Sequence, residues 1–140
     1  MSRFLWTCLL LALAAVCDAC RQSAPRADLL PPTVAGVWHR STLETVGSGE
    51  APDPVPRTSI NHLQVAAYEG PGKLEARLYE LDSPGVALDL VQRWRPSADT
   101  VFFYRDKYFV VLKWQDADRK ALEAFVRELE ARLGKPKEPA

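Results

Sequence analysis

Two histidines carry the most versatile chemistry in this 140-residue chain. His39 and His62 could bind a metal ion or transfer protons near neutral pH. Neither stands in an HxH or HExxH spacing, the patterns that bring paired metal ligands together. We interpret both as surface or hydrogen-bonded structural histidines, and a His-dependent hydrolase or metal enzyme stays the alternative.

Nucleophilic and phosphate-binding motifs are missing around the serines and glycines. No serine lies in a G-x-S-x-G motif, and Ser83 is explained as a helix cap. The glycines at 47–49 and 70–72 lack the strand–loop–helix setting of a phosphate cradle. Asp116 and Asp118 have no twelve-residue calcium loop around them. The sequence therefore predicts no catalytic residue, no metal site and no cofactor.

One group of side chains combines the aromatic and cationic types that form hot spots in protein interfaces. The group begins near Trp94 and continues through a predicted hairpin. The candidate interaction residues are Trp94, Arg95, Tyr104, Arg105, Lys107, Phe109 and Val111. The alternative interpretation is a core stripe that contains Trp94 and Trp114, beside a solvated turn at 105–107.

The first 20 residues predict export. They contain one cation, Arg3, then an apolar stretch without charge over residues 4–16, and they end in small residues and cysteines. This is the pattern of a secretory signal, because the apolar stretch is too short to span a membrane. We expect a signal peptide over 1–19. The mature chain would reach the periplasm, the periplasmic face of a bacterial membrane or the cell exterior.

Cleavage after Ala19 would make Cys20 the N-terminal residue of the mature chain. Bacterial lipoprotein processing leaves such a cysteine, and its diacylglyceryl group anchors the chain to a membrane. The lipoprotein box is imperfect, because Cys17 stands where Leu is usual. The sequence leaves two alternatives, a lipoprotein modified at Cys20 and a freely secreted chain.

Composition excludes further classes. The chain has 18 basic and 18 acidic residues and a formal net charge of zero, so we expect no nucleic-acid partner. All three cysteines lie within the first 20 residues. The folded part therefore has neither a disulfide framework nor a thiolate zinc site.

The sequence predicts one compact α+β domain over residues 58–134. Residues 20–57 are predicted to be a flexible tether and N-terminal extension, because proline, glycine and charge interrupt any periodicity. Residues 135–140 are predicted to be a disordered tail.

Hydrophobic periodicity predicts the elements of this domain. Period-two alternation and aromatic or β-branched runs predict strands at 63–68, 73–81, 100–104 and 108–114. Helical spacing predicts helices at 84–95, capped by Ser83, and at 117–133, capped by Asp116 or Asp118. The simplest arrangement is a four-stranded antiparallel sheet, ordered strand-strand-helix-strand-strand-helix, with both helices on one face.

The strand at 108–114 is apolar on both sides. Val110 and Leu112 alternate with Phe109 and Val111, whereas a sheet with one face in water should alternate apolar and polar residues. Helices on a single face cover only one of these sets. We expect the other to be covered by the segment around Trp38 or by a second copy of the chain.

The stretch YELDSPGVALDLVQRW…TVFFYRDKYFVVLKW resembles a family of uncharacterised secreted bacterial proteins, known only as a domain of unknown function, with tandem α+β half-units. The matching positions within residues 60–133 are Tyr79, Ser83, Ala87, the hairpin at 104–108 and the helix at 122–133. This chain has one unit rather than two. The resemblance implies that a second copy occupies the place of the missing half, and it implies no activity.

Together these patterns favour an exported, non-enzymatic binding module of the cell envelope. The expected partners are an envelope protein or a second copy paired through the sheet as a homodimer, and the membrane if Cys20 carries a lipid. The alternative is a periplasmic protein that binds a small ligand in an apolar pocket lined by Phe103, Phe109 and Val111.

Overall fold

Residues 28–134, which a computed structural model describes, form six strands and two α-helices. The strands are β1 (Thr33–Val34), β2 (Trp38–Thr45), β3 (Ile60–Gly70), β4 (Gly72–Leu81), β5 (Thr100–Arg105) and β6 (Tyr108–Gln115). The helices are α1 (Pro84–Arg93) and α2 (Arg119–Leu133), and single 3-10 turns lie at η1 (Ser48–Glu50) and η2 (Arg57–Ser59).

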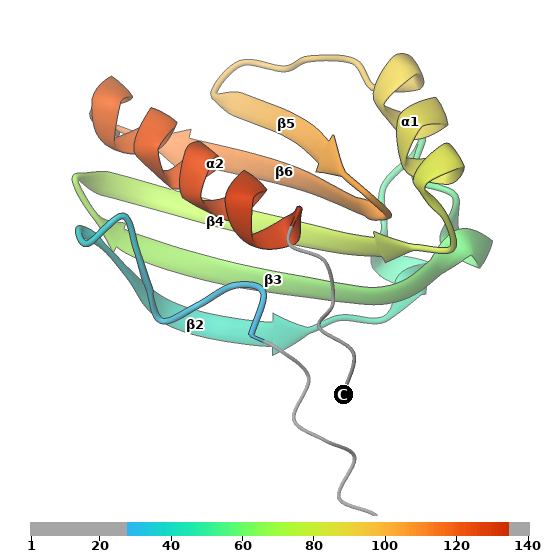
Figure 1. Ribbon diagram of the computed structural model, residues 1–140, viewed down its shortest axis with the longest axis horizontal. Coiled ribbons are helices and arrows are strands. Elements are labelled where there is room, and N and C mark those ends of the chain that lie inside the picture. Colours follow the sequence, from blue (N-terminus) through green and yellow to red (C-terminus); the bar gives the residue numbers. More distant parts are fainter. Residues whose placement is uncertain (1–27, 135–140) are drawn as a thin grey trace, which may run out of the picture.

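All six strands belong to one curled sheet, in the order β1-β2-β3-β4-β6-β5 (Figure 1). Every neighbouring pair is antiparallel. The α+β class agrees with the prediction, but the four-stranded sheet is wrong, because residues 33–45 add two strands. Their sequence gave a weak signal, since β1 has only two residues and most of β2 is exposed.

Residues 28–57 are part of the folded domain rather than a flexible tether. Leu30, Val34 and Trp38 are almost completely buried. The Tyr68 hydroxyl on β3 donates a hydrogen bond to the carbonyl oxygen of Pro31 at 2.8 Å. The compact fold therefore includes residues 28–57, and the predicted domain start at 58 comes too late. The predicted signal peptide, Cys20 and the predicted tail at 135–140 lie outside the described residues.

Capping residues set the beginnings of both helices. The Ser83 hydroxyl accepts from the Val86 N–H at 3.3 Å, and Pro84 occupies the first helical position, where no N–H is needed. The Asp118 carboxylate accepts from the Ala121 N–H at 3.0 Å, which decides between the two predicted caps. Gly134 ends α2 with a φ of −85°, so it is not in the left-handed conformation that C-terminal glycines often adopt.

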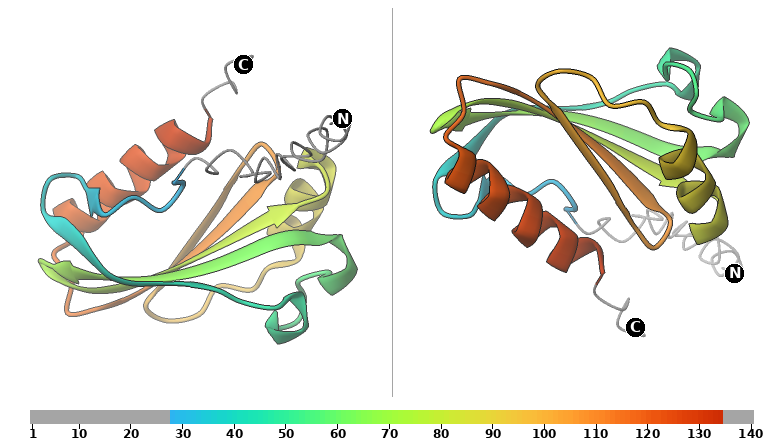
Figure 2. Two further views of the ribbon diagram at one scale, coloured as in Figure 1. Left: turned by 90° about the horizontal axis from the view of Figure 1, so that it is seen from below. Right: turned by 90° about the horizontal axis from the view of Figure 1, so that it is seen from above.

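The two helices pack on opposite faces of the sheet, and the prediction that they share one face is wrong (Figure 2). Leu74 and Leu78 of β4 and Val110 of β6 pack with the apolar stripe of α2. Tyr79, one position after Leu78, and Phe109, one position before Val110, pack with α1. Side chains alternate between faces along a strand, so α1 covers the set of β6 residues that α2 leaves open.

This arrangement explains why β6 is apolar on both sides. Phe109 and Val111 are buried under α1 together with Ala51 and Val55, which come from the segment predicted to be flexible. Away from α1 the same face becomes charged, and Arg77 pairs there with Glu75 at 2.8 Å. Both faces of β6 are thus covered within one chain, and burial of Phe109 and Val111 needs no second copy.

Candidate functional site

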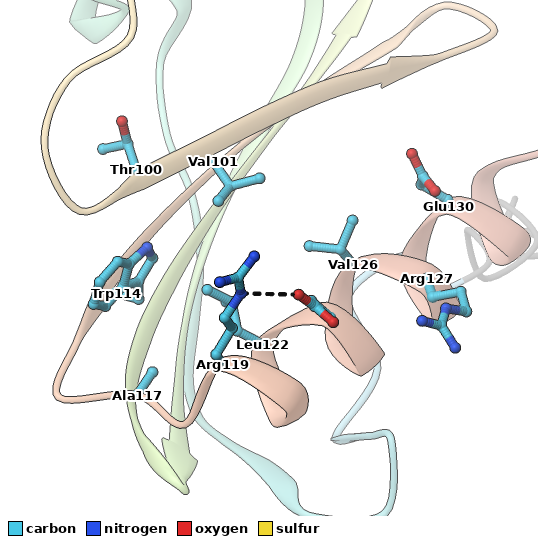
Figure 3. Close-up of a pocket in the computed structure, with 10 residues that line it drawn as sticks. Thr100, Val101, Trp114, Ala117, Arg119, Leu122, Val126, Arg127 and Glu130 are labelled. Carbon is cyan, nitrogen blue, oxygen red and sulfur yellow. Dashed lines mark hydrogen bonds and ion pairs between the residues drawn. The ribbon is translucent and has the colours of Figure 1, made fainter.

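A groove lies between the edge strand β5 and the helix α2 (Figure 3). Its volume is about 680 Å³, within the range of ligand-binding clefts. Its walls come from the start of β5, the end of β6 and one side of α2. The lining residues are Thr100, Val101, Trp114, Ala117, Arg119, Leu122, Glu123, Val126, Arg127 and Glu130.

The floor of the groove is apolar. Val101 on β5 and Trp114 at the end of β6 point toward α2, which contributes Leu122 and Val126 (Figure 3). Leu122 is buried, whereas the other three are half-buried. Half-buried apolar side chains in a concave site can lose further contact with water when a ligand binds, which favours binding.

The groove stays open because two hydrogen bonds hold α2 near the other edge of the sheet, at β1 and β2. The Trp38 indole Nε1 on β2 donates to the carbonyl oxygen of Ala121 at 3.0 Å. The Glu128 carboxylate accepts from the backbone N–H of Ala35, just after β1. Both bonds hold α2 toward the β1–β2 edge, and β5 is the edge furthest from it. The α2-facing side chain of Val101 is consequently only half-buried.

Charges of both signs alternate along the α2 wall. Arg119 Nε lies 3.1 Å from Glu123 Oε1 (Figure 3), and Arg127 and Glu130 follow along the helix. Such an exposed ion pair contributes little to stability. The α2 wall therefore presents charges of both signs rather than a field of one sign.

Three of the predicted interaction residues belong to the core beneath α1. The ring centroids of Trp94 and Phe109 are 5.1 Å apart. Phe109 is fully buried, and Val111 lies in the same buried cluster. Phe109 is therefore inaccessible, Val111 is only 9% exposed, and Trp94 is half-buried against them.

The other four predicted interaction residues do not form one surface with these. Arg95 is exposed after the end of α1, and Tyr104 and Arg105 end β5. Lys107, in the β5–β6 turn, pairs with Glu80 at 3.0 Å. A hydrogen bond to the Glu80 carboxylate raises the pKa of Lys107, because that contact favours the charged ammonium group. Only Tyr104 and Arg105 lie on the strand that borders the groove.

The small-ligand pocket predicted from Phe103, Phe109 and Val111 does not form. Phe103 packs against the cluster that includes α2, whereas Phe109 and Val111 pack against α1. The sheet separates these side chains.

The two histidines are far apart as well. His39 pairs with Glu69 across the β2–β3 ladder, whereas His62 lies on β3 itself, seven positions earlier. At about 3.3 Å per residue the two positions are roughly 23 Å apart along the strand. Among residues 28–134 no three His, Cys, Asp or Glu side chains are grouped so that they could hold a metal ion.

Two buried tyrosines carry the clearest electrostatic perturbations. Burial raises the pKa of Tyr68, and the nearby Arg40 opposes part of that increase. Burial also raises the pKa of Tyr79, and Arg77 opposes it there. Both phenols therefore stay neutral at physiological pH.

None of the residues that line the groove is among the predicted interaction residues, so sequence reasoning missed this site. One signal was present: Val126 makes the apolar stripe of α2 wider than Leu122, Phe125 and Leu129 alone require for packing. The position of β5 at the sheet edge could not be read from its sequence.

No protein-family model, no curated protein and no solved structure matches the chain. The resemblance to the tandem secreted family stays an expectation. No helix within residues 28–134 is long and apolar enough to cross a membrane.

Proposed function

We propose that this chain is an exported, non-enzymatic binding module whose groove between β5 and α2 holds an apolar stretch of a partner protein in the cell envelope. The observation that carries this proposal is the groove itself. It combines an apolar floor at Val101, Trp114 and Val126 with a wall of alternating charge, beside an edge strand.

The apolar floor favours a ligand with apolar side chains. Transfer of apolar surface from water contributes about 25 cal/mol per Å². Trp114 adds a large aromatic ring, a side-chain type that often anchors protein interfaces. The groove is open along the side of α2, so it can accept a segment of chain as well as a compact molecule.

The lining residues support binding rather than bond breaking. They include no histidine, cysteine or serine, and the one hydroxyl group is that of Thr100. The ionisable groups, such as the Arg119–Glu123 pair, stand on the exposed wall of α2, where solvent screens their charges. They are suited to orienting a polar backbone or side chain.

The proposed location follows from the N-terminal sequence. The described fold begins at Asp28, eight positions after Cys20. A fully extended chain spans at most about 3.6 Å per residue, so a lipid on Cys20 would hold Asp28 within about 29 Å of the membrane surface. The groove would then recognise a protein in or close to the same membrane.

Photo-crosslinking in the native cells tests the groove. A benzophenone amino acid is placed at Val126, inside the groove, or at Ala131, an exposed position of α2 outside it. We expect a discrete cross-linked protein from position 126 and not from 131, because only the first lies against the bound segment.

The alternatives give different results. Identical cross-linked products from both positions, or none from position 126, would contradict the proposed groove. A small molecule that copurifies with the protein, and is lost in Val126→Glu but kept in Ala131→Glu, would instead support the small-ligand alternative. Native mass spectrometry of the purified chain detects such a molecule.

A further inference from the structure

The two edges of the sheet differ in how they are protected. At one edge β1 has only two residues and follows Pro31 and Pro32, and short strands and prolines block unwanted pairing. At the other edge β5 has six residues, TVFFYR, with no proline and a single charge at its end. No strand within residues 28–134 pairs with the outer side of β5. The edge of β5 therefore has no strand partner among the described residues, and the connection from α1 passes along its outer side before it enters the strand (Figure 1), where Ser97 is hydrogen-bonded to Thr100.

The outward backbone groups of β5 follow from its pairing with β6. The Asp99 carbonyl oxygen accepts from the Trp114 N–H at 2.9 Å. Along an antiparallel strand successive residues point their N–H and C=O groups alternately toward and away from the neighbour. The groups of Thr100, Phe102 and Tyr104 therefore point away from β6. Figure 2, seen from above, looks onto this edge and shows the connection from α1 meeting β5 at its start.

We propose that β5 pairs antiparallel with β5 of a second copy, about a two-fold axis at Phe102, to form one continuous sheet. In this register Phe102 faces its own copy, and Thr100 of each chain faces Tyr104 of the other. A shift of two residues in either direction leaves one outward residue of the strand without a partner. A two-fold interface of this kind is self-complementary.

Charge complementarity supports the same register. It places Arg105 of each chain opposite Asp99 of the other, so that both ends of the paired strands carry opposite charges. These two residues flank five uncharged residues, 100–104. Opposite charges across neighbouring strands are favourable, whereas like charges are not.

The side chains of β5 also fit the pairing. Phe102 lies on the α1 side, with its ring centroid 6.2 Å from that of Trp94, and it would meet Phe102 of the second copy. Tyr104, which is 37% exposed, would lie against Thr100. Aromatic cross-strand pairs stabilise antiparallel sheets. This inference concerns the edge of β5 and does not depend on what occupies the groove.

Sedimentation velocity of the full chain between micromolar and millimolar concentration tests the pairing, with Tyr104→Pro and Tyr104→Ala as matched variants. Proline removes the outward N–H at 104 without removing a bond to β6, whereas alanine keeps that N–H. We expect a monomer–dimer equilibrium for the native chain and for Tyr104→Ala. We expect the Kd of Tyr104→Pro to rise at least ten-fold. An unchanged Kd in Tyr104→Pro would contradict the pairing.

Hydrogen exchange on the native chain gives a second test that needs no variant. The amides of Phe102 and Tyr104 should be protected at high protein concentration and should exchange rapidly after dilution. The amides of Val101 and Phe103, which point toward β6, should stay protected at both concentrations. At low salt, Asp99→Asn should raise the Kd about 2- to 30-fold, since it removes two exposed ion pairs. A chain that stays monomeric throughout, or a dimer in which the amides at 102 and 104 exchange freely, would overturn the proposal.

Discussion

The indole Nε1 of Trp38 donates a hydrogen bond to the carbonyl oxygen of Ala121 at 3.0 Å, which joins β2 to the first turn of α2. Trp38 is fully buried, and its ring contacts Phe125 edge to face at 6.1 Å between centroids. Together with the bond from the Ala35 N–H to Glu128, this contact holds α2 over the sheet. It therefore also determines how wide the groove on the other side of α2 stays.

Replacement of this tryptophan should destabilise the fold strongly. Trp38→Phe leaves a cavity and removes the indole hydrogen bond to the Ala121 carbonyl oxygen, and we expect the free energy of unfolding to fall by about 2–4 kcal/mol. Urea unfolding followed by circular dichroism measures this. Trp114→Phe, in the half-buried groove, is the control and should cost less than about 1.5 kcal/mol. Equal losses in the two variants would show that Trp38 does not hold α2.

Neighbouring positions on α2 should separate folding from binding. Phe125 is fully buried between Trp38 and Tyr68, with ring centroids 5.0 Å apart in the second pair. Phe125→Ala should cost about 3–5 kcal/mol of unfolding free energy. Val126→Ala removes two methyl groups from a half-buried groove position and should cost less than about 1 kcal/mol. If Val126→Ala destabilises the fold as much as Phe125→Ala, the groove is a packing site.

Local signals predicted the elements from β3 to α2 well, because each is specified by its own sequence. Ser83 and Pro84 begin α1, and alternation of Leu74, Ala76 and Leu78 specifies a face of β4. The arrangement of these strands and helices in space was harder to predict. Phe109 and Val111 of β6 indicate that the second face of the sheet is covered. They do not indicate that α1, rather than another segment, covers this face.

The N-terminal strands were missed for a physical reason. Most of β2 is exposed, so its residues lack the apolar alternation that sequence analysis detects. Its place in the sheet depends on hydrogen bonds to β3 and on a few buried anchors, such as Leu30 and Trp38. The groove depends in turn on those anchors, so it could not be predicted from local patterns.

The two buried tyrosines should respond differently to loss of the hydroxyl group. The Tyr68 hydroxyl donates to Pro31 at 2.8 Å, so Tyr68→Phe should cost about 1 kcal/mol of unfolding free energy at neutral pH. The Tyr79 hydroxyl is buried and makes no hydrogen bond of good geometry with the described residues. Tyr79→Phe should therefore change stability by less than about 0.5 kcal/mol. Chemical denaturation of both variants measures the difference, and the reverse order would contradict these assignments.

Stability should fall at alkaline pH. Burial raises the pKa of Tyr68 and Tyr79 in the folded state, so the unfolded chain loses these protons first. The stabilisation is complete below the ordinary tyrosine pKa of about 10 and is lost as pH rises toward the folded values. Glu80 raises the pKa of Lys107 in the folded state, so deprotonation of Lys107 also lowers stability as the pH rises. Denaturation between pH 7 and 11 should show this decline, and the Tyr68→Phe, Tyr79→Phe double variant should show a shallower one.

Cys20 should decide where the protein resides. If its thiol carries a diacylglyceryl group, the acyl chains supply about 0.8 kcal/mol of membrane affinity per buried CH₂. Cys20→Ala would then move the protein from the membrane fraction to the soluble exported fraction, whereas Cys17→Ala, within the predicted leader, would leave it in the membrane. Cell fractionation, with mass spectrometry of the N-terminus, measures both. A native chain that is exported but soluble, with an unmodified N-terminus, would favour the freely secreted alternative. A chain kept in the cytosol would contradict export itself, and with it a partner in the envelope.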